Sequence, residues 1–143
     1  MRYPINDVTQ DIGLLQSLFS KTVGDVLRWA DAEKRCSITP CYGPASMLAA
    51  DVGKPEGGKF IYEGYTLVIS TPVPILTLAT SQGKMPRLVG DELRKLSIEI
   101  VNPKMTGETH RDRYVLTGDS PLASNNLGKI GAEASLEGVA KRS

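Results

Sequence analysis

The spacing of apolar residues changes along the chain, and this change limits the fold more than any other feature. In the first part, apolar residues recur every three or four positions and therefore share one helical face; they are Val8, Ile12, Leu15, Phe19, Val23, Val26 and Ala30. Further on, Leu96, Ile98 and Ile100 alternate with polar residues, as in a strand with one buried face. We therefore predict an α+β fold: an N-terminal helix or helix pair packed on a small antiparallel β-sheet or barrel, with an extended C-terminal arm.

The same pattern divides a single globular domain into four segments. Gly24, together with a second capping box that begins at Thr22, leaves two versions of the first segment open: one bent helix, or two helices at roughly 8–20 and 23–35. Prolines and glycines punctuate the next segment, and residues favoured in strands dominate after it. The segments are a helical part at 1–35, a connector at 36–58 that can hold one short helix starting at Pro44, a small antiparallel β domain at 59–118, and an extended arm at 119–143.

The last segment is poor in large apolar side chains. Residues 120–143 contain only five large aliphatic residues, too few to offset the entropy that a free segment loses on ordering. We expect this arm to become ordered on a neighbouring subunit. The N-terminal "MRYPIND" has the same interpretation, because Pro4 disfavours a helix before it. The predicted partner-contact residues are Tyr3, Ile5, Trp29, Leu122, Leu127, Ile130 and Leu136, with Trp29 either covering the edge of the core or anchoring a partner.

Charge and hydropathy exclude two classes of partner. The 143 residues carry 17 basic and 16 acidic side chains, a net charge of +1 that is too small to attract nucleic acid to the whole chain. The chain has no apolar run near the about 18 to 20 residues that span a bilayer. Its polar N-terminal residues are also unlike a secretory signal. We therefore expect a protein of the cytoplasm, or of a particle assembled there.

Two sequence patterns resemble ligand sites but lack essential parts. Cys36 and Cys41 have four residues between them, at the limit of the about two to four that separate paired zinc ligands. No third cysteine follows and His110 is the single histidine, so we interpret both as buried or half-buried thiols and predict no metal and no cofactor. In "GKPEGGKF", Phe60 stands where a phosphate-binding loop needs Ser or Thr.

His110 is the main candidate for a catalytic residue. It lies between Glu108 and Asp112, and a carboxylate could orient its imidazole as a general base. No nucleophile stands in a G-x-S-x-G motif, however, so a solvated hairpin loop is the favoured interpretation. A small enzyme using His110 stays open as an alternative.

A helix-turn-helix over residues 8–35 is a second alternative. It would present basic side chains to DNA, namely Lys21, Arg28, Lys34 and Arg35. Acidic residues on the same segment oppose this, and an ordinary packing helix is the favoured interpretation. The first hypothesis is thus a non-enzymatic assembly subunit of a larger protein complex, typical of a phage capsid, neck or tail component, which forms a homo-oligomer or binds other protein subunits through its terminal arms.

Overall fold

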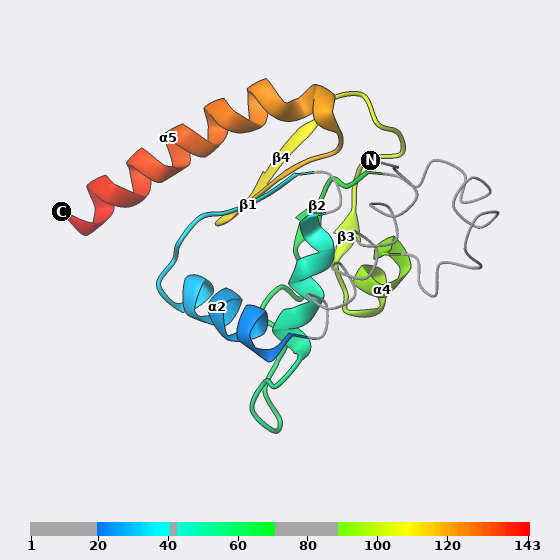
Figure 1. Cartoon of the computed structure of the whole chain (residues 1–143), viewed down its shortest axis with the longest axis vertical. Coiled ribbons are helices and arrows are strands. Elements are labelled where there is room, and N and C mark those ends of the chain that lie inside the picture. The colour runs from blue at the N-terminus through cyan, green and yellow to red at the C-terminus, as the bar shows by residue number, and fades with distance from the viewer. Residues whose placement is uncertain (1–19, 41–42, 71–88) are drawn as a thin grey trace, which may run out of the picture.

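The computed structural model describes residues 20–40, 43–70 and 89–143. Tyr3, Ile5, Cys41, all but the last residue of the helix predicted at roughly 8–20, and residues 71–88 of the predicted β domain lie outside these described residues. The elements, labelled in Figure 1, are α2 (Lys21–Ala32), β1 (Ser37–Pro40), the 3-10 helix η1 (Gly43–Asp51), β2 (Thr66–Leu67), α4 (Val89–Lys95), β3 (Glu99–Ile100), β4 (Thr109–Asp112), β5 (Val115–Gly118), the 3-10 helix η2 (Pro121–Ala123) and α5 (Ser124–Arg142).

The strands form two small sheets. In the larger, the order is β1-β5-β4, with β1 parallel and β4 antiparallel to the central β5; in the smaller, β2 and β3 are parallel. The antiparallel arrangement expected from the sequence therefore holds for β4 and β5, which one short turn joins. The other two pairs are parallel because long connections that contain helices separate their strands, as parallel pairing requires.

The first helix packs very closely on η1. The Ser20 side chain accepts a hydrogen bond from the Val23 N–H and caps α2 at its start. Gly24 does not interrupt the helix; it lies where a Cβ atom would stand 2.2 Å from the Ala49 carbonyl oxygen, so only glycine allows this approach. Arg28 then donates to the carbonyl oxygens of Ala50 and Val52, at 2.7 and 2.9 Å, where η1 ends.

Residues 119–143 are not an extended arm, which corrects the prediction from the sequence. Apart from the short η2 they form the 19-residue helix α5, which lies against β5 and β1 on one side of the larger sheet, while α2 and η1 lie on the other (Figure 1). Leu127, Gly131 and Ala134 face the sheet at helical spacing. The small residues of this segment made it look poor in apolar surface, but they let α5 lie very close to β1. A Cβ atom added to Gly131 would stand 2.8 Å from Ile38 Cδ1.

Strand β5 separates two hydrophobic clusters. All four of its residues are buried, and successive side chains point to opposite faces. Leu116 joins Leu127 and Ala134 under α5, with Cys36 and Ile130 at the margin. Val115 joins the larger cluster on the other face, which contains Met47, Ala50, Phe60, Tyr62, Tyr65, Leu67, Ile69, Leu93 and Ile98. The predicted alternation at 96–100 is confirmed by burial, since Ile98 is buried between the exposed Ser97 and Glu99.

Candidate functional site

His110 belongs to a polar cluster that joins the two sheets. His110 and Asp112 are alternate residues of β4, so both side chains point to the same face. His110 Nε2 lies 2.7 Å from Thr66 Oγ1 in β2, and Asp112 Oδ2 accepts from the Thr66 N–H at 2.8 Å and from its hydroxyl at 3.1 Å. His110 and Asp112, one of the two carboxylates that flank it in the sequence, therefore both contact Thr66, and His110 lies in strand β4 and not in the solvated loop favoured from the sequence.

The hydrogens of this cluster define its chemistry. The Thr66 hydroxyl has one proton: when it donates this proton to Asp112, it accepts from His110 in the tautomer that carries its hydrogen on Nε2. Hydrogen bonds from Arg113, opposed by partial burial and aided by those from Thr66, lower the pKa of Asp112 to about 2. A carboxylate this acidic is a very weak base, so the arrangement does not activate the hydroxyl for attack; it holds β2 against β4.

Arg113 reinforces the same contact. Besides its two hydrogen bonds to Asp112, it donates to the Gly64 carbonyl oxygen at 3.1 Å, and its guanidinium lies 3.5 Å from the centre of the Tyr65 ring. Gly64 has φ +76°, a left-handed conformation that glycine adopts readily and that the turn before β2 uses. The contacts of this cluster therefore hold the turn before β2 against the end of β4.

A second buried carboxylate, Asp119, organises the loop before β4. It has no exposed surface and accepts hydrogen bonds from the N–H groups of Thr106 and Gly107 and from the Ser120 hydroxyl. Burial raises its pKa, but these hydrogen bonds together lower it below the ordinary value. Its carboxylate is therefore occupied by contacts within the protein, and its role is structural.

The carboxyl end of β1 precedes the 3-10 helix η1 in the sequence. β1 is a parallel strand that ends at Pro40, and η1 begins at Gly43. In open α/β sheets, ligands bind beyond the carboxyl ends of parallel strands, and a nucleophile often stands at a strand-to-helix turn. Cys41 occupies the junction in the sequence, although its structure lies outside the described residues. The prolines and glycines of residues 36–58 predict a connector and conceal β1; the signal for it is the order strand, cysteine, Gly-Pro, helix.

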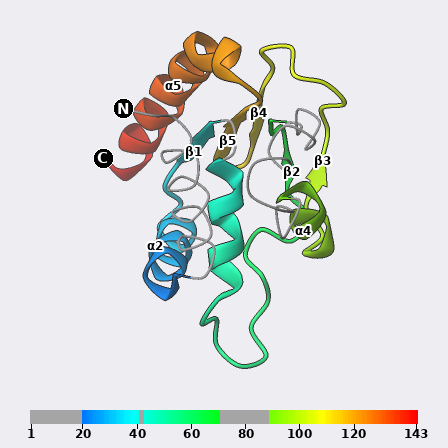
Figure 2. The same ribbon diagram turned by 45° about the vertical axis from the view of Figure 1, so that its right-hand side comes forward.

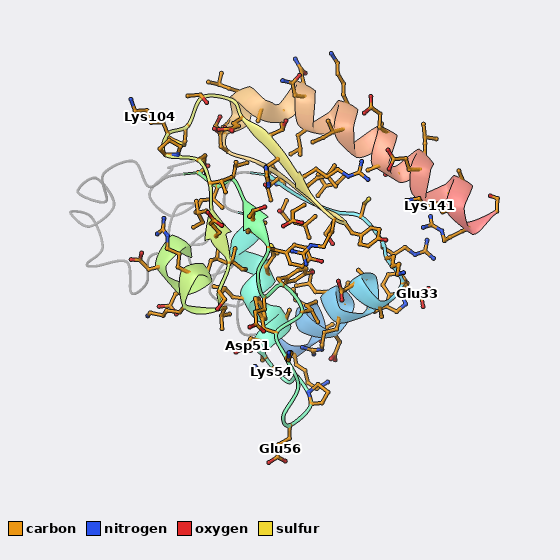
Figure 3. All side chains as sticks on the ribbon, turned by 180° about the vertical axis from the view of Figure 1, so that it is seen from behind. Glu33, Asp51, Lys54, Glu56, Lys104 and Lys141 are labelled. Atoms are coloured by element: carbon orange, nitrogen blue, oxygen red, sulfur yellow. The ribbon has the colours of Figure 1, made fainter. Side chains whose placement is uncertain are left out.

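A cavity of about 540 Å³ lies between the ends of α2 and α5. Figure 3 shows Glu33 and Lys141 at these two facing ends. The charged side chains that line the cavity are mostly basic. The basic ones are Lys34, Arg35, Arg111, Lys141 and Arg142, and the acidic ones are Glu33 and Glu137. Glu137 pairs with Arg111 at 2.7 Å. The buried Nε of Arg35 has no hydrogen-bond partner among the described residues. The half-buried Cys36 also lines the cavity.

The predicted partner contacts divide into two groups. Leu127 and Ile130 pack inside the protein, so their assignment to a neighbouring subunit is wrong. Trp29, Leu122 and Leu136 are exposed. Within residues 20–40, 43–70 and 89–143 no cluster of His, Cys, Asp and Glu could hold a metal ion, and no helix in these ranges is long and apolar enough to cross a membrane.

The basic residues proposed for DNA binding are partly engaged. Arg28 hydrogen-bonds η1 and pairs with Asp25 at 2.6 Å, and Lys21 also pairs with Asp25. Helix α2 makes its most extensive contact with η1. Its geometry is that of a packing helix, the interpretation favoured from the sequence.

Solved structures with a similar fold include an enzyme. The crystal structure of glyoxalase III from Candida albicans superposes with a TM-score of 0.68 over 85% of this chain and 52% of that one, at 14% identity. Identity this low supports a common fold and no more. No family model matches the sequence.

Curated relatives are more similar in sequence. The chain is 42% identical over 127 residues to the protein/nucleic acid deglycase HchA of Pseudomonas aeruginosa strain UCBPP-PA14, a match that covers 85% of this chain and 43% of the relative. The corresponding protein of Staphylococcus aureus strain MRSA252 is 38% identical over 125 residues, 84% of this chain and 41% of the relative. The chain thus spans less than half the length of the curated relatives it matches. These relatives are named as enzymes, which contradicts the hypothesis of a non-enzymatic phage or virion subunit.

Proposed function

We propose that this chain forms part of a deglycase-type enzyme, which removes sugar-derived or glyoxal-derived groups from amines of proteins or nucleic acids. The observation that carries the proposal is the 42% identity over 127 residues to a protein/nucleic acid deglycase. The likeness in fold to a glyoxalase III agrees with it. Among the hypotheses drawn from the sequence, we therefore develop the alternative that the chain belongs to an enzyme.

We assign the nucleophile to Cys41 and not to the His110 cluster. Thr66 and Asp112 use their hydrogen bonds to hold β2 and β4 together, as described above. In the sequence Cys41 follows the last residue of β1 and precedes η1 by two positions, and a thiolate at such a strand-to-helix junction would be stabilised by helix N–H groups. A thiolate is a strong nucleophile toward the carbonyl carbon of a glyoxal adduct. A cytoplasmic location, where thiols stay reduced, suits this chemistry and stays a prediction.

The two cysteines provide a matched test. A glyoxal-modified peptide is incubated with the 143-residue chain, alone and with the part of the P. aeruginosa relative that its match leaves out, and the released amine is measured by mass spectrometry. We expect Cys41→Ser to lower the rate at least 100-fold, because a hydroxyl is far less ionised than a thiol. Cys36→Ser, which changes a thiol beside the Leu116 cluster, should retain most of the rate.

The control is the fragment of the relative without this chain, whose rate is subtracted. Equal rates for Cys41→Ser and Cys36→Ser would remove Cys41 as the nucleophile. Absence of amine release in every combination would contradict the proposed activity itself.

A further inference from the structure

We infer that the cavity between the ends of α2 and α5 is a binding site for a small organic phosphate. Its walls come from the segment that joins α2 to β1, from the hairpin of β4 and β5, and from the C-terminal half of α5. Figure 1 and Figure 2 both show the segment between α2 and β1 beside the C-terminal half of α5. Cys36 in this wall precedes β1, whereas the proposed nucleophile Cys41 follows β1 in the sequence, so the inference does not depend on the proposed activity.

The first observation is the charge of the cavity wall. Among the described residues, five basic and two acidic side chains line it. Arg111 donates to Glu137 at 2.7 Å and lowers the pKa of this acid, so the pair compensates itself and leaves four basic groups against Glu33. The carboxyl ends of the two helices each carry about half a negative charge, which offsets about one of the remaining positive charges. The cavity therefore attracts an anion with more than one negative charge.

The second observation is the position of Arg35. Its guanidinium lies 5.7 Å from the centre of the Trp29 ring, a contact that limits its orientation. Its buried Nε has no hydrogen-bond acceptor among the described residues. Buried N–H groups are normally paired, and a phosphate oxygen is an acceptor whose charge and geometry suit a guanidinium. We therefore expect Arg35 to contact the phosphate directly.

The third observation is the backbone of Lys34. This residue follows the C-cap of α2 with φ +53°, in the left-handed region where glycine is favoured after a helix. Lysine is less favourable than glycine for this backbone conformation, so its contribution must come from the side chain, which lines the cavity. Backbone strain of this kind is concentrated at binding sites.

The fourth observation is the size of the cavity and its apolar part. A volume of about 540 Å³ lies within the range of sites that hold small molecules. Beside the charged groups, the wall contains the ring of Tyr114 and the side chains of Ala134 and Val139. An inorganic anion would leave this part of the cavity unfilled. The ligand is therefore expected to carry an organic group, such as an aromatic ring, on its phosphate.

The experiment compares phenyl phosphate with inorganic phosphate, each titrated into the 143-residue chain by isothermal titration calorimetry. We expect phenyl phosphate to bind at least tenfold more tightly, because its ring covers the apolar part of the wall. Binding should change the fluorescence of Trp29, the single tryptophan, since the guanidinium beside its ring contacts the phosphate. It should also slow the alkylation of Cys36 by iodoacetamide at least tenfold, measured by mass spectrometry on fragment ions that separate Cys36 from Cys41.

Variants separate binding from folding. Arg35→Gln should weaken the binding of phenyl phosphate at least tenfold, and Lys141→Gln at least threefold. Lys34→Gly should also weaken binding at least threefold without lowering the urea midpoint, because glycine suits the left-handed backbone; a merely structural lysine would not show this combination. Lys129→Gln is the matched control: it changes an exposed lysine of α5 that does not line the cavity, and it should leave binding unchanged.

Three results would overturn the inference. One is that phenyl phosphate binds no more tightly than inorganic phosphate, or does not bind at all. Another is that Cys36 is alkylated equally fast with and without saturating phenyl phosphate. The third is that binding disappears when the part of the P. aeruginosa relative outside its match to this chain is added, which would show that polypeptide fills the cavity. All three are measured on the unchanged chain, so they hold even if a variant misfolds.

Discussion

At the residue scale, Asp112 connects the two sheets. Its carboxylate lies at the end of β4 and accepts from both the N–H and the hydroxyl of Thr66 in β2, while Arg113 donates to its two oxygens. These hydrogen bonds reach their full strength only when the carboxyl group is ionised, and they lower the pKa of Asp112 to about 2. A group whose pKa is lower in the folded state stabilises the protein above its unfolded pKa and loses that contribution as the pH falls.

The pH dependence follows from this shift. Ionised Asp112 should contribute about 2 kcal/mol to the free energy of unfolding above about pH 4, and this contribution should disappear between about pH 4 and pH 2. Asp112→Asn should therefore lower the urea midpoint at pH 7 and flatten its fall between pH 4 and pH 2. Asp91→Asn, at an exposed pair with Arg94, is the matched control and should change neither. An unaltered acid profile in Asp112→Asn would contradict the assignment.

At the element scale, α5 depends on one narrow face. Leu127 is 5% exposed and packs against Leu116, whereas Leu136 on the outer face is 70% exposed. The outer face carries charged residues and forms one ion pair to the sheet, between Glu137 and Arg111. The helix is thus held by a few aliphatic contacts and by the closeness that Gly131 and Ala134 permit.

Two leucines of α5 test this arrangement. Leu127→Ala should lower the free energy of unfolding by about 2–4 kcal/mol, because it leaves a cavity between α5 and β5. Leu136→Ala should change it by less than about 0.5 kcal/mol, since alanine favours the helix and little surface is lost. Both are measured by urea denaturation followed by circular dichroism. Similar effects for the two variants would contradict the packing of α5 on the sheet.

The elements also show what the sequence could predict. The helical period of Val23, Val26 and Ala30 predicted α2, and the alternation at 96–100 predicted the buried face of Ile98, because both patterns are local. β1 was missed because four residues between two cysteines, the last of them a proline, carry almost no periodicity. α5 was missed because glycine and alanine, which have little apolar surface, can still form a buried face when a helix packs closely. Of the site, the sequence offered Glu108 and Asp112 as carboxylates near His110, but Thr66, which contacts both His110 and Asp112, comes from a distant strand and was not foreseen.

At the scale of the whole molecule, the C-terminal segment completes the fold. Without it Leu116 would lose its cover on one face, and the loop at Thr106 and Gly107 would lose the carboxylate of Asp119. The segment predicted from the sequence to be an arm on a neighbouring subunit is therefore an integral part of this fold.

Truncation therefore has a clear outcome. A chain that ends at Gly118 should lose cooperative thermal unfolding, measured by circular dichroism, because one face of the larger sheet becomes exposed. A chain that ends at Gly138 lacks only exposed residues of the last turn and should unfold within about 0.5 kcal/mol of the intact chain. A cooperative transition in the shorter chain would show that α5 is dispensable.

The parallel pairing of β1 with β5 also determines when the sheet can form during translation. Ser37 pairs with Val115, so β1 emerges from the ribosome long before the strand it needs. Such distant pairing folds slowly, and an early strand with both edges open is exposed to aggregation in the meantime. The nascent chain must therefore keep β1 unpaired from β5 until Val115 and the residues after it have been synthesised.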